Sequence, residues 1–246
     1  MTLSFWKIAA HFAATDPLPF AAGEAGNYWR GKLGMLLPPE WFSPKRVGGP
    51  SGLADPPRPF VLRIPEDQPL LVGVNVFAAD AVEPLKEALL KLGAVTIESE
   101  PVTLSLLDTG EAVAGLRVSM VTPTELKGGP QPAFHVLFAR VRDRISTLRA
   151  LYGDGPLEID FRAMGTRAKD VRLMRCELRH VLAQRSSSRT GQTHALNGFI
   201  GTMEYEGALT EFLPLLRAAE WTGVGRQTVW GKGQIVVETF DVESHI

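Results

Sequence analysis

The sequence predicts an α+β protein whose two halves repeat one order of elements, strand-helix-strand-strand-helix-strand. Several short runs alternate apolar and polar residues, as half-buried strands do, and longer runs carry apolar residues at helical spacing. Glycine, proline and aspartate separate these runs, as turns require. The chain has 246 residues, of which 45% are hydrophobic and 22% charged, so it is long enough for one large domain or two small ones.

We assign the first half to residues 1–110. Its first strand shows the alternation well, with apolar Trp6 and Ile8 on either side of Lys7. Asn27 is a candidate N-cap for the first helix, and a proline pair ends that helix. The expected strands are Leu3–Ala13, Phe60–Ile64, Leu70–Phe77 and Val95–Leu106, and the expected helices are Asn27–Leu37 and Asp80–Leu92.

The second half, residues 111–246, repeats this order more loosely. An Asp-Thr-Gly turn at 108–110 marks the boundary. In the last helix, Pro214 predicts a start no earlier than about Phe212, or a kink there. The expected strands are Ala114–Met120, Leu157–Phe161, Val171–Ala183, His194–Tyr205 and Gln234–Phe240, and the expected helices are Phe134–Leu151 and Leu209–Glu220.

A glycine-rich segment, Gly223–Gly233, joins the last helix to the last strand. Its glycines permit positive φ and close backbone approach, and its polar side chains suit phosphate oxygens. It matches neither the dinucleotide fingerprint nor the P-loop, because the spacing and the order of elements differ. A turn that only makes a tight connection remains the alternative. The candidate phosphate-binding residues are Gly223, Gly225, Arg226, Thr228, Gly231, Lys232 and Gly233.

Charge is uneven along the chain, although the net charge is only −1. Residues 162–189 hold eight basic residues against two acidic ones, a net charge of +6. Residues 184–192 overlap the end of this stretch and extend three residues past it. They are polar and lie between strand-like segments, as the tip of a phosphate-binding hairpin would. A solvated strand face would show the same charge, so both interpretations stay open.

Several classes of protein are disfavoured by the sequence. Cys176 is the only cysteine, so an intramolecular disulfide framework is excluded and no metal-ligand spacing is visible. Lys7 and His11 interrupt any signal-peptide core, and no stretch approaches 18 uncharged apolar residues. No Gly-x-Ser-x-Gly nucleophile elbow is present. We therefore expect a cytoplasmic protein without membrane partners and without a metal site.

Five stretches carry a resemblance to a known family. Leu196–Gly233 resembles the C-terminal signature of the CRISPR repeat-processing endoribonucleases of the RAMP superfamily. Asn27–Gly34 is similar to the family's Arg-Gly-x-Leu-Gly helix, and Gly48–Arg63 to the loop and strand that follow it. Thr122-Pro123 and the helix from Phe134 fall where the family begins its second half. The resemblance implies two tandem ferredoxin-like (RRM-like) domains with a C-terminal glycine-rich loop.

The resemblance also implies a chemistry, which is RNA cleavage without a metal ion or other cofactor. The 2′-hydroxyl attacks the adjacent phosphorus, leaving a 2′,3′-cyclic phosphate and a 5′-hydroxyl. The reaction needs a base, an acid and cations around the phosphorane. Expected partners are CRISPR repeat RNA and other CRISPR effector subunits.

The usual catalytic histidine is absent from this sequence. Many family members carry it in or near the first helix, whereas Met35 stands here after the helix motif. His194, next to the polar tip, is our first candidate for acid or base, and Tyr28 and Lys32, at i and i+4, are candidates to assist it. Four arginines outside the glycine-rich segment are RNA-binding candidates, namely Arg30, Arg58, Arg185 and Arg189; for the proline-rich loop before Arg58, a rigid connector is the alternative.

Two functions of different classes follow from the resemblance. The first is an endoribonuclease that matures guide RNAs from repeat transcripts. The second is a non-catalytic RAMP subunit that binds guide RNA in an effector complex, which the missing helix histidine favours. A nucleotide-ligand sensor is a third possibility that no motif supports.

Overall fold

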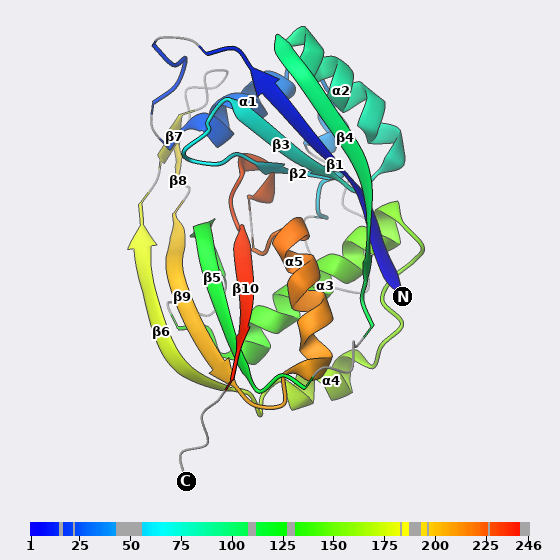
Figure 1. Cartoon of the computed structure of the whole chain (residues 1–246), viewed down its shortest axis with the longest axis vertical. Coiled ribbons are helices and arrows are strands. Elements are labelled where there is room, and N and C mark those ends of the chain that lie inside the picture. The colour runs from blue at the N-terminus through cyan, green and yellow to red at the C-terminus, as the bar shows by residue number, and fades with distance from the viewer. Residues whose placement is uncertain are drawn as a thin grey trace.

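The first half folds around one four-stranded antiparallel sheet in the computed structural model of the chain. Its strands are β1 (Thr2–Phe12), β2 (Phe60–Arg63), β3 (Leu71–Val76) and β4 (Ala94–Ser105), in the order β2-β3-β1-β4. The helices α1 (Ala25–Leu33) and α2 (Val82–Lys91) cover one face, as Figure 1 shows. The single-turn helices η1 (Pro39–Trp41) and η2 (Ala79–Ala81) follow α1 and precede α2. The expected order of elements is confirmed here.

The second half repeats the arrangement. Its sheet has the order β10-β5-β9-β6, from β5 (Gly115–Thr124), β6 (Arg172–Val181), β9 (Gly198–Glu206) and β10 (Ile235–Phe240). The helices α3 (Phe134–Tyr152) and α5 (Leu213–Thr222) pack on its inner face, with η3 (Thr210–Phe212) leading into α5. Each half therefore has the strand order of a ferredoxin-like domain, with the two central strands flanked by the second and fourth.

The structure describes residues 1–14, 17–21, 23–42, 56–107, 112–126, 131–182, 184–186, 193–195, 197–225 and 227–241. For the short strands β7 (Gln184–Ser186) and β8 (Thr193–Ala195), the description covers the backbone. The expected boundary turn at 108–110 and the candidates Arg189 and Arg226 lie outside these residues. Among the described helices, none is long and apolar enough to cross a membrane.

Three sequence expectations are wrong in detail. The expected strand Leu157–Phe161 does not form; Phe161 instead begins α4 (Phe161–Arg167), whose N-cap Asp160 accepts hydrogen bonds from two backbone amides. Helix α1 begins two residues before Asn27, with Glu24 as N-cap, and ends at Leu33. The expected strand His194–Tyr205 divides into β8, which pairs with β7, and β9.

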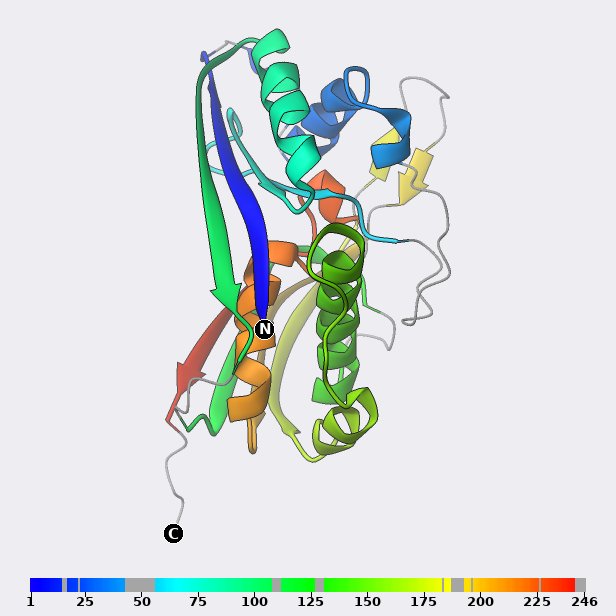
Figure 2. The same ribbon diagram turned by 90° about the vertical axis from the view of Figure 1, so that its right-hand side faces the viewer.

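The two halves share a hydrophobic core at their junction. Leu3 and Phe5, at the start of β1, are buried against the second half, and the ring of Phe5 lies 5.3 Å from that of Trp221 in α5. Figure 2 shows β1 and β4 extending along α5. The C-terminal end of α5 therefore lies against the first sheet, and the glycine-rich segment begins there.

Candidate functional site

The glycine-rich segment forms a closed loop between α5 and β10 that contains the single-turn helix η4 (Thr228–Trp230). Val224 N–H donates to the carbonyl oxygen of Gly233 at 2.8 Å, which closes the loop at its base. Gly233 has φ +72°, and a Cβ there would lie 2.1 Å from the Val224 oxygen. Gly225 has φ +78°, with the Glu125 oxygen 2.5 Å from a Cβ. Both positions require glycine, because close backbone contact and positive φ coincide.

The polar residues of this loop turn partly inward. Thr228 is only 5% exposed, and its hydroxyl accepts a 2.7 Å hydrogen bond from Arg144 Nη2. A phosphate contact by Thr228 would therefore require the loop to open. Lys232 is half-buried, and this burial lowers the pKa of its ammonium group.

Beneath the loop, three side chains from three different elements donate to the last carbonyl groups of α5. Arg63 Nη2 donates to Glu220 and Trp221, both at 3.1 Å; Asn75 Nδ2 donates to Trp221 at 2.8 Å; and Arg144 Nε donates to Thr222 at 2.9 Å. The carbonyl end of a helix is its negative pole, so cations are stabilised there.

Burial changes the protonation behaviour of the two arginines. Burial and, secondly, the nearby charge of Arg144 lower the pKa of Arg63 to about 9. Burial and then repulsion by Arg58 lower the pKa of Arg144 to about 10. Both values lie above 7, so both guanidinium groups are charged at neutral pH. The sequence analysis missed this pair, although Arg144 lies three residues after Val141 and four before Leu148, on the apolar stripe of its helix.

Helix α1 rests directly on the glycine-rich loop. A Cβ at Gly26 would lie 2.2 Å from the carbonyl oxygen of Trp230, so only glycine permits this approach. Arg30 Cζ lies 4.0 Å from the centroid of the Trp230 ring and 5.2 Å from that of Phe42, within cation–π range. The candidate Arg30 therefore links α1 to the loop.

Tyr28 and Lys32, the other two candidates on α1, have the expected geometry. Lys32 Nζ lies 5.4 Å from the centroid of the Tyr28 ring, so the two side chains share a face as their spacing predicts. The Tyr28 ring also packs at 4.9 Å on Phe20. Arg58, in contrast, donates to the backbone oxygens of Phe42 and Pro56, which ties it to its own connecting segment.

A comparison with protein families finds a match to part of this arrangement. The family model described as CRISPR-associated endoribonuclease Cas6 matches residues 118–235, which include α3, the hairpin strands, α5 and the glycine-rich loop. The match covers 118 of the 246 residues, and over this part the chain is similar to the Cas6 family. No curated protein sequence matches the chain.

Solved Cas6 structures share the whole fold. Thermus thermophilus Cas6 is 15% identical, with a TM-score of 0.60 over 97% of this chain and 99% of that one. A Cas6 substrate-mimic complex is 18% identical, with a TM-score of 0.58 over 96% and 100%. A Cas6 product complex is 14% identical, with a TM-score of 0.61 over 96% and 99%. At these identities the likeness concerns the fold.

In this chain, β7 and β8 form a hairpin that lies beside α1 in both views (Figures 1 and 2). Its register pairs Arg185 with His194. The backbone of the histidine candidate thus belongs to the same end of the molecule as the helix that carries Tyr28 and Lys32. Among the described residues, no three His, Cys, Asp or Glu side chains gather as a metal site.

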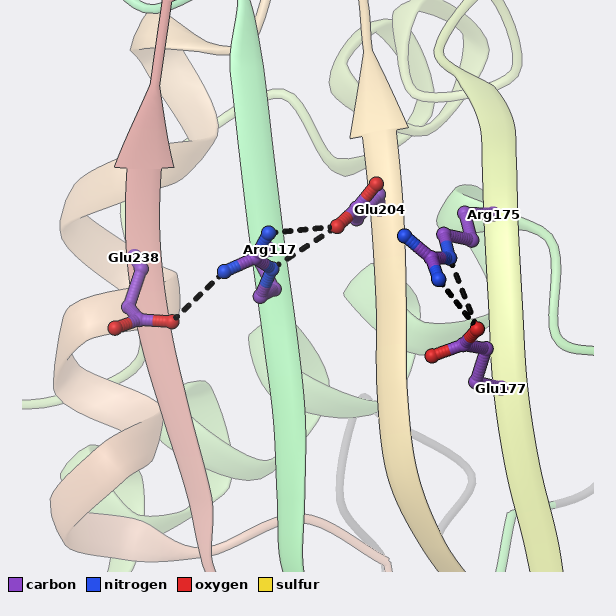
Figure 3. A network of polar contacts seen from close by, with 5 residues as sticks. All are labelled: Arg117, Arg175, Glu177, Glu204 and Glu238. Carbon is purple, nitrogen blue, oxygen red and sulfur yellow. Dashed lines mark hydrogen bonds and ion pairs between the residues drawn. The ribbon is translucent and has the colours of Figure 1, made fainter.

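In the folded protein, ion pairs neutralise part of the positive charge of the basic segment, residues 162–189. Carboxylates from distant parts of the chain pair with its arginines, including Glu211 with Arg167 at 2.6 Å and Glu206 with Arg172 at 3.5 Å. Figure 3 shows the outer face of the second sheet, where Arg175 pairs with Glu177 at 2.6 Å. The +6 of residues 162–189 therefore overstates the charge of this surface, and β6 presents a solvated face with paired charges.

On the same face, a second ion-pair group joins three strands. Arg117 in β5 reaches Glu204 in β9 at 2.8 Å and Glu238 in β10 at 3.8 Å, as Figure 3 shows. A hydrogen bond to Glu177 raises the pKa of Arg175 in the neighbouring strand. These arginines pair with carboxylates, whereas no ion pair between residues that the structure describes involves the two arginines beneath the loop.

Proposed function

We propose that this protein belongs to the Cas6 family and is an endoribonuclease that cleaves CRISPR repeat RNA into guide RNAs. The observation that carries the proposal is the family match, which spans the glycine-rich loop and the hairpin. Support comes from the shared fold of structures described as Cas6 product and substrate-mimic complexes. We further propose that residues 1–110 and 111–246 act as two domains, and that the protein works in the cytoplasm, where repeat transcripts arise.

The RNA would bind where α1, the β7–β8 hairpin and the glycine-rich loop converge. Backbone amides of the loop and Lys232 would contact phosphates, while Arg185 and Arg189 would grip the RNA from the hairpin. The 2′-oxygen would then attack the scissile phosphorus as the bond to the 5′-oxygen breaks. His194 would take or supply the proton, Tyr28 would orient the reacting groups, and Lys32 would neutralise the phosphorane.

Cleavage of labelled repeat RNA in the presence of a chelator tests the mechanism. We expect cleavage to persist, and we expect a 2′-deoxy nucleotide before the scissile bond to abolish it. His194→Ala should slow cleavage by about 10² to 10⁴ while leaving RNA binding intact. His180→Ala is the matched control, because that exposed ring lies on β6, 5.2 Å from Phe199. Wild-type rates for His194→Ala would refute its assignment.

The salt dependence of RNA binding tests the hairpin. Replacing both Arg185 and Arg189 by Glu should flatten the slope of log affinity against log salt by more than one unit, since each phosphate contact contributes about 0.7 to 0.9. Arg175→Glu is the control on the paired sheet face and should leave the slope unchanged. An unchanged slope for the hairpin variant would remove its arginines from the RNA-binding surface.

One observation favours a second candidate function, a non-catalytic subunit that binds guide RNA. Met35, where many family members carry a histidine after the helix motif, is 70% exposed and offers no proton. One similar structure, 10% identical, is described as a Cas6-RT-Cas1–Cas2 complex; this chain covers 29% of that chain. An intact protein that binds repeat RNA tightly, cleaves none of it and is indifferent to 2′-deoxy substitution would favour this candidate.

A further inference from the structure

The guanidinium of Arg144 joins two segments that border the glycine-rich loop. Its Nε donates to the carbonyl oxygen of Thr222, at the end of α5, and its Nη2 donates to the hydroxyl of Thr228, at the start of η4. We propose that Arg144 is a positioning residue for RNA recognition, which holds the glycine-rich loop in its binding shape without touching RNA. The inference rests on the proposed function, because it assigns that loop to RNA.

The geometry favours positioning over direct contact. A guanidinium is planar and donates in fixed directions, so two hydrogen bonds at 2.9 and 2.7 Å fix η4 relative to α5. Thr228, the acceptor in the loop, is buried, and burial also lowers the pKa of Arg144. The donors of Arg144 that these bonds use therefore point into the protein.

The effect of Arg144 extends to α1. The helix η4 that it holds ends at Trp230, whose carbonyl lies against Gly26 and whose ring lies under Arg30. A shift of η4 would therefore displace the helix that carries Tyr28 and Lys32. Among the ion pairs of the described residues, none involves Arg144, so its hydrogen bonds to the loop are not backed by a carboxylate.

Arg149 provides a matched control on the same helix. It is also buried, and it donates to the backbone oxygens of Gly155 and Thr2, neither of which belongs to the loop. Arg144→Met and Arg149→Met should therefore cost similar stability, but only the first should alter the loop. The first measurement is hydrogen exchange of the amides of residues 223–233, which needs no RNA. We expect faster exchange in Arg144→Met and an unchanged rate in Arg149→Met.

The second measurement is binding of a labelled RNA, namely the CRISPR repeat that binds the wild-type protein most tightly in a panel. Arg144→Met should weaken binding roughly 10-fold or more, the loss expected from a charged hydrogen bond, with the salt slope unchanged. Arg149→Met should change affinity by less than about 2-fold, within the scatter expected of a site that does not couple to RNA. If Arg144→Met does not fold, Thr228→Val tests the same hydrogen bond: it should speed exchange of residues 223–233 without RNA and also weaken binding, and weaker binding with unchanged exchange would overturn the positioning role.

Each other outcome has a distinct meaning. A salt slope that falls by about 0.7 to 0.9 in Arg144→Met would show a direct phosphate contact and overturn the positioning role. Unchanged exchange in residues 223–233, or equal losses of affinity in both arginine variants, would overturn it as well. Altered exchange in a protein whose wild type binds no repeat RNA would instead overturn the proposed function and the RNA role of Arg144 with it.

Discussion

The arginines beneath the glycine-rich loop and those on the outer face of the second sheet have opposite environments. Arg63 and Arg144 donate to backbone and hydroxyl oxygens in the interior, where burial lowers the pKa of each guanidinium. Arg117 and Arg175 lie on an exposed face and pair with carboxylates (Figure 3). The first pair holds the two halves and the loop together, whereas the second balances charge on a solvated surface.

The density of basic residues along the sequence does not show which arginines are paired at the surface and which are buried. Arg167 and Arg172 belong to the densest basic stretch of the chain, yet their acidic partners, in η3 and β9, lie far away in sequence. The interior arginines lie outside that stretch, on β2 and α3. The basic run in the sequence therefore marked exposed arginines, whereas the buried arginines that donate to the end of α5 lie outside it.

The largest expected effect concerns the loop that the interior arginines support. Gly233→Ala should lower the free energy of unfolding by about 3–5 kcal/mol, because positive φ and a carbonyl 2.1 Å from the new Cβ both oppose it. Gly231→Ala is the control, since its φ is +75° but nothing lies within 4 Å; it should cost about 1–2 kcal/mol. Urea unfolding measures both. Equal losses would mean that the loop relaxes freely.

An intermediate effect is expected for the interior arginines themselves. Arg63→Met should lower the free energy of unfolding by about 1–3 kcal/mol, because it leaves the Glu220 and Trp221 carbonyls with fewer donors. The gain from removing a buried charge limits the loss. Thermal unfolding of this variant beside Arg175→Met makes the comparison direct. A loss no larger than that of the surface variant would erase the distinction between the two regions.

The smallest effect is expected on the outer sheet face. Arg117→Ala should lower the free energy of unfolding by less than about 1 kcal/mol, although it removes contacts to both Glu204 and Glu238, because the side chain is 46% exposed. The loss should shrink further at high salt, where exposed pairs are screened. Urea unfolding at low and high ionic strength checks both points, and a loss that persisted at high salt would contradict them.

Much of the fold could be predicted because hydrophobic periodicity reports burial on one face. The expected strand Phe60–Ile64 differs from β2 by one residue, and Pro214 indeed lies in the first turn of α5. The expected strand Leu157–Phe161 is wrong because apolar and polar residues that alternate over only five positions also fit a loop that leads into a helix cap. There Asp160 satisfies the first amides of α4, and that local hydrogen bonding outweighed the strand pattern.

The site was predictable only in part. The sequence located the glycine-rich loop and the shared face of Tyr28 and Lys32, because glycine content and helical spacing are local properties. It could not assign Arg63 or Arg144, since the carbonyl groups that need donors are defined only when the first sheet meets the end of α5. The RNA-binding and catalytic roles remain predictions.

The close contact between Gly26 and the Trp230 carbonyl has a thermodynamic consequence. Because α1 lies in direct contact with η4, a ligand that favours one arrangement of the loop must favour the matching arrangement of the helix. Linkage makes this coupling reciprocal. The factor by which a change in α1 alters the ligand affinity of the loop equals the factor by which ligand binding to the loop alters the equilibrium between arrangements of α1. In the proposed function, RNA binding by the loop and the position of Tyr28 and Lys32 on α1 would be coupled in this way.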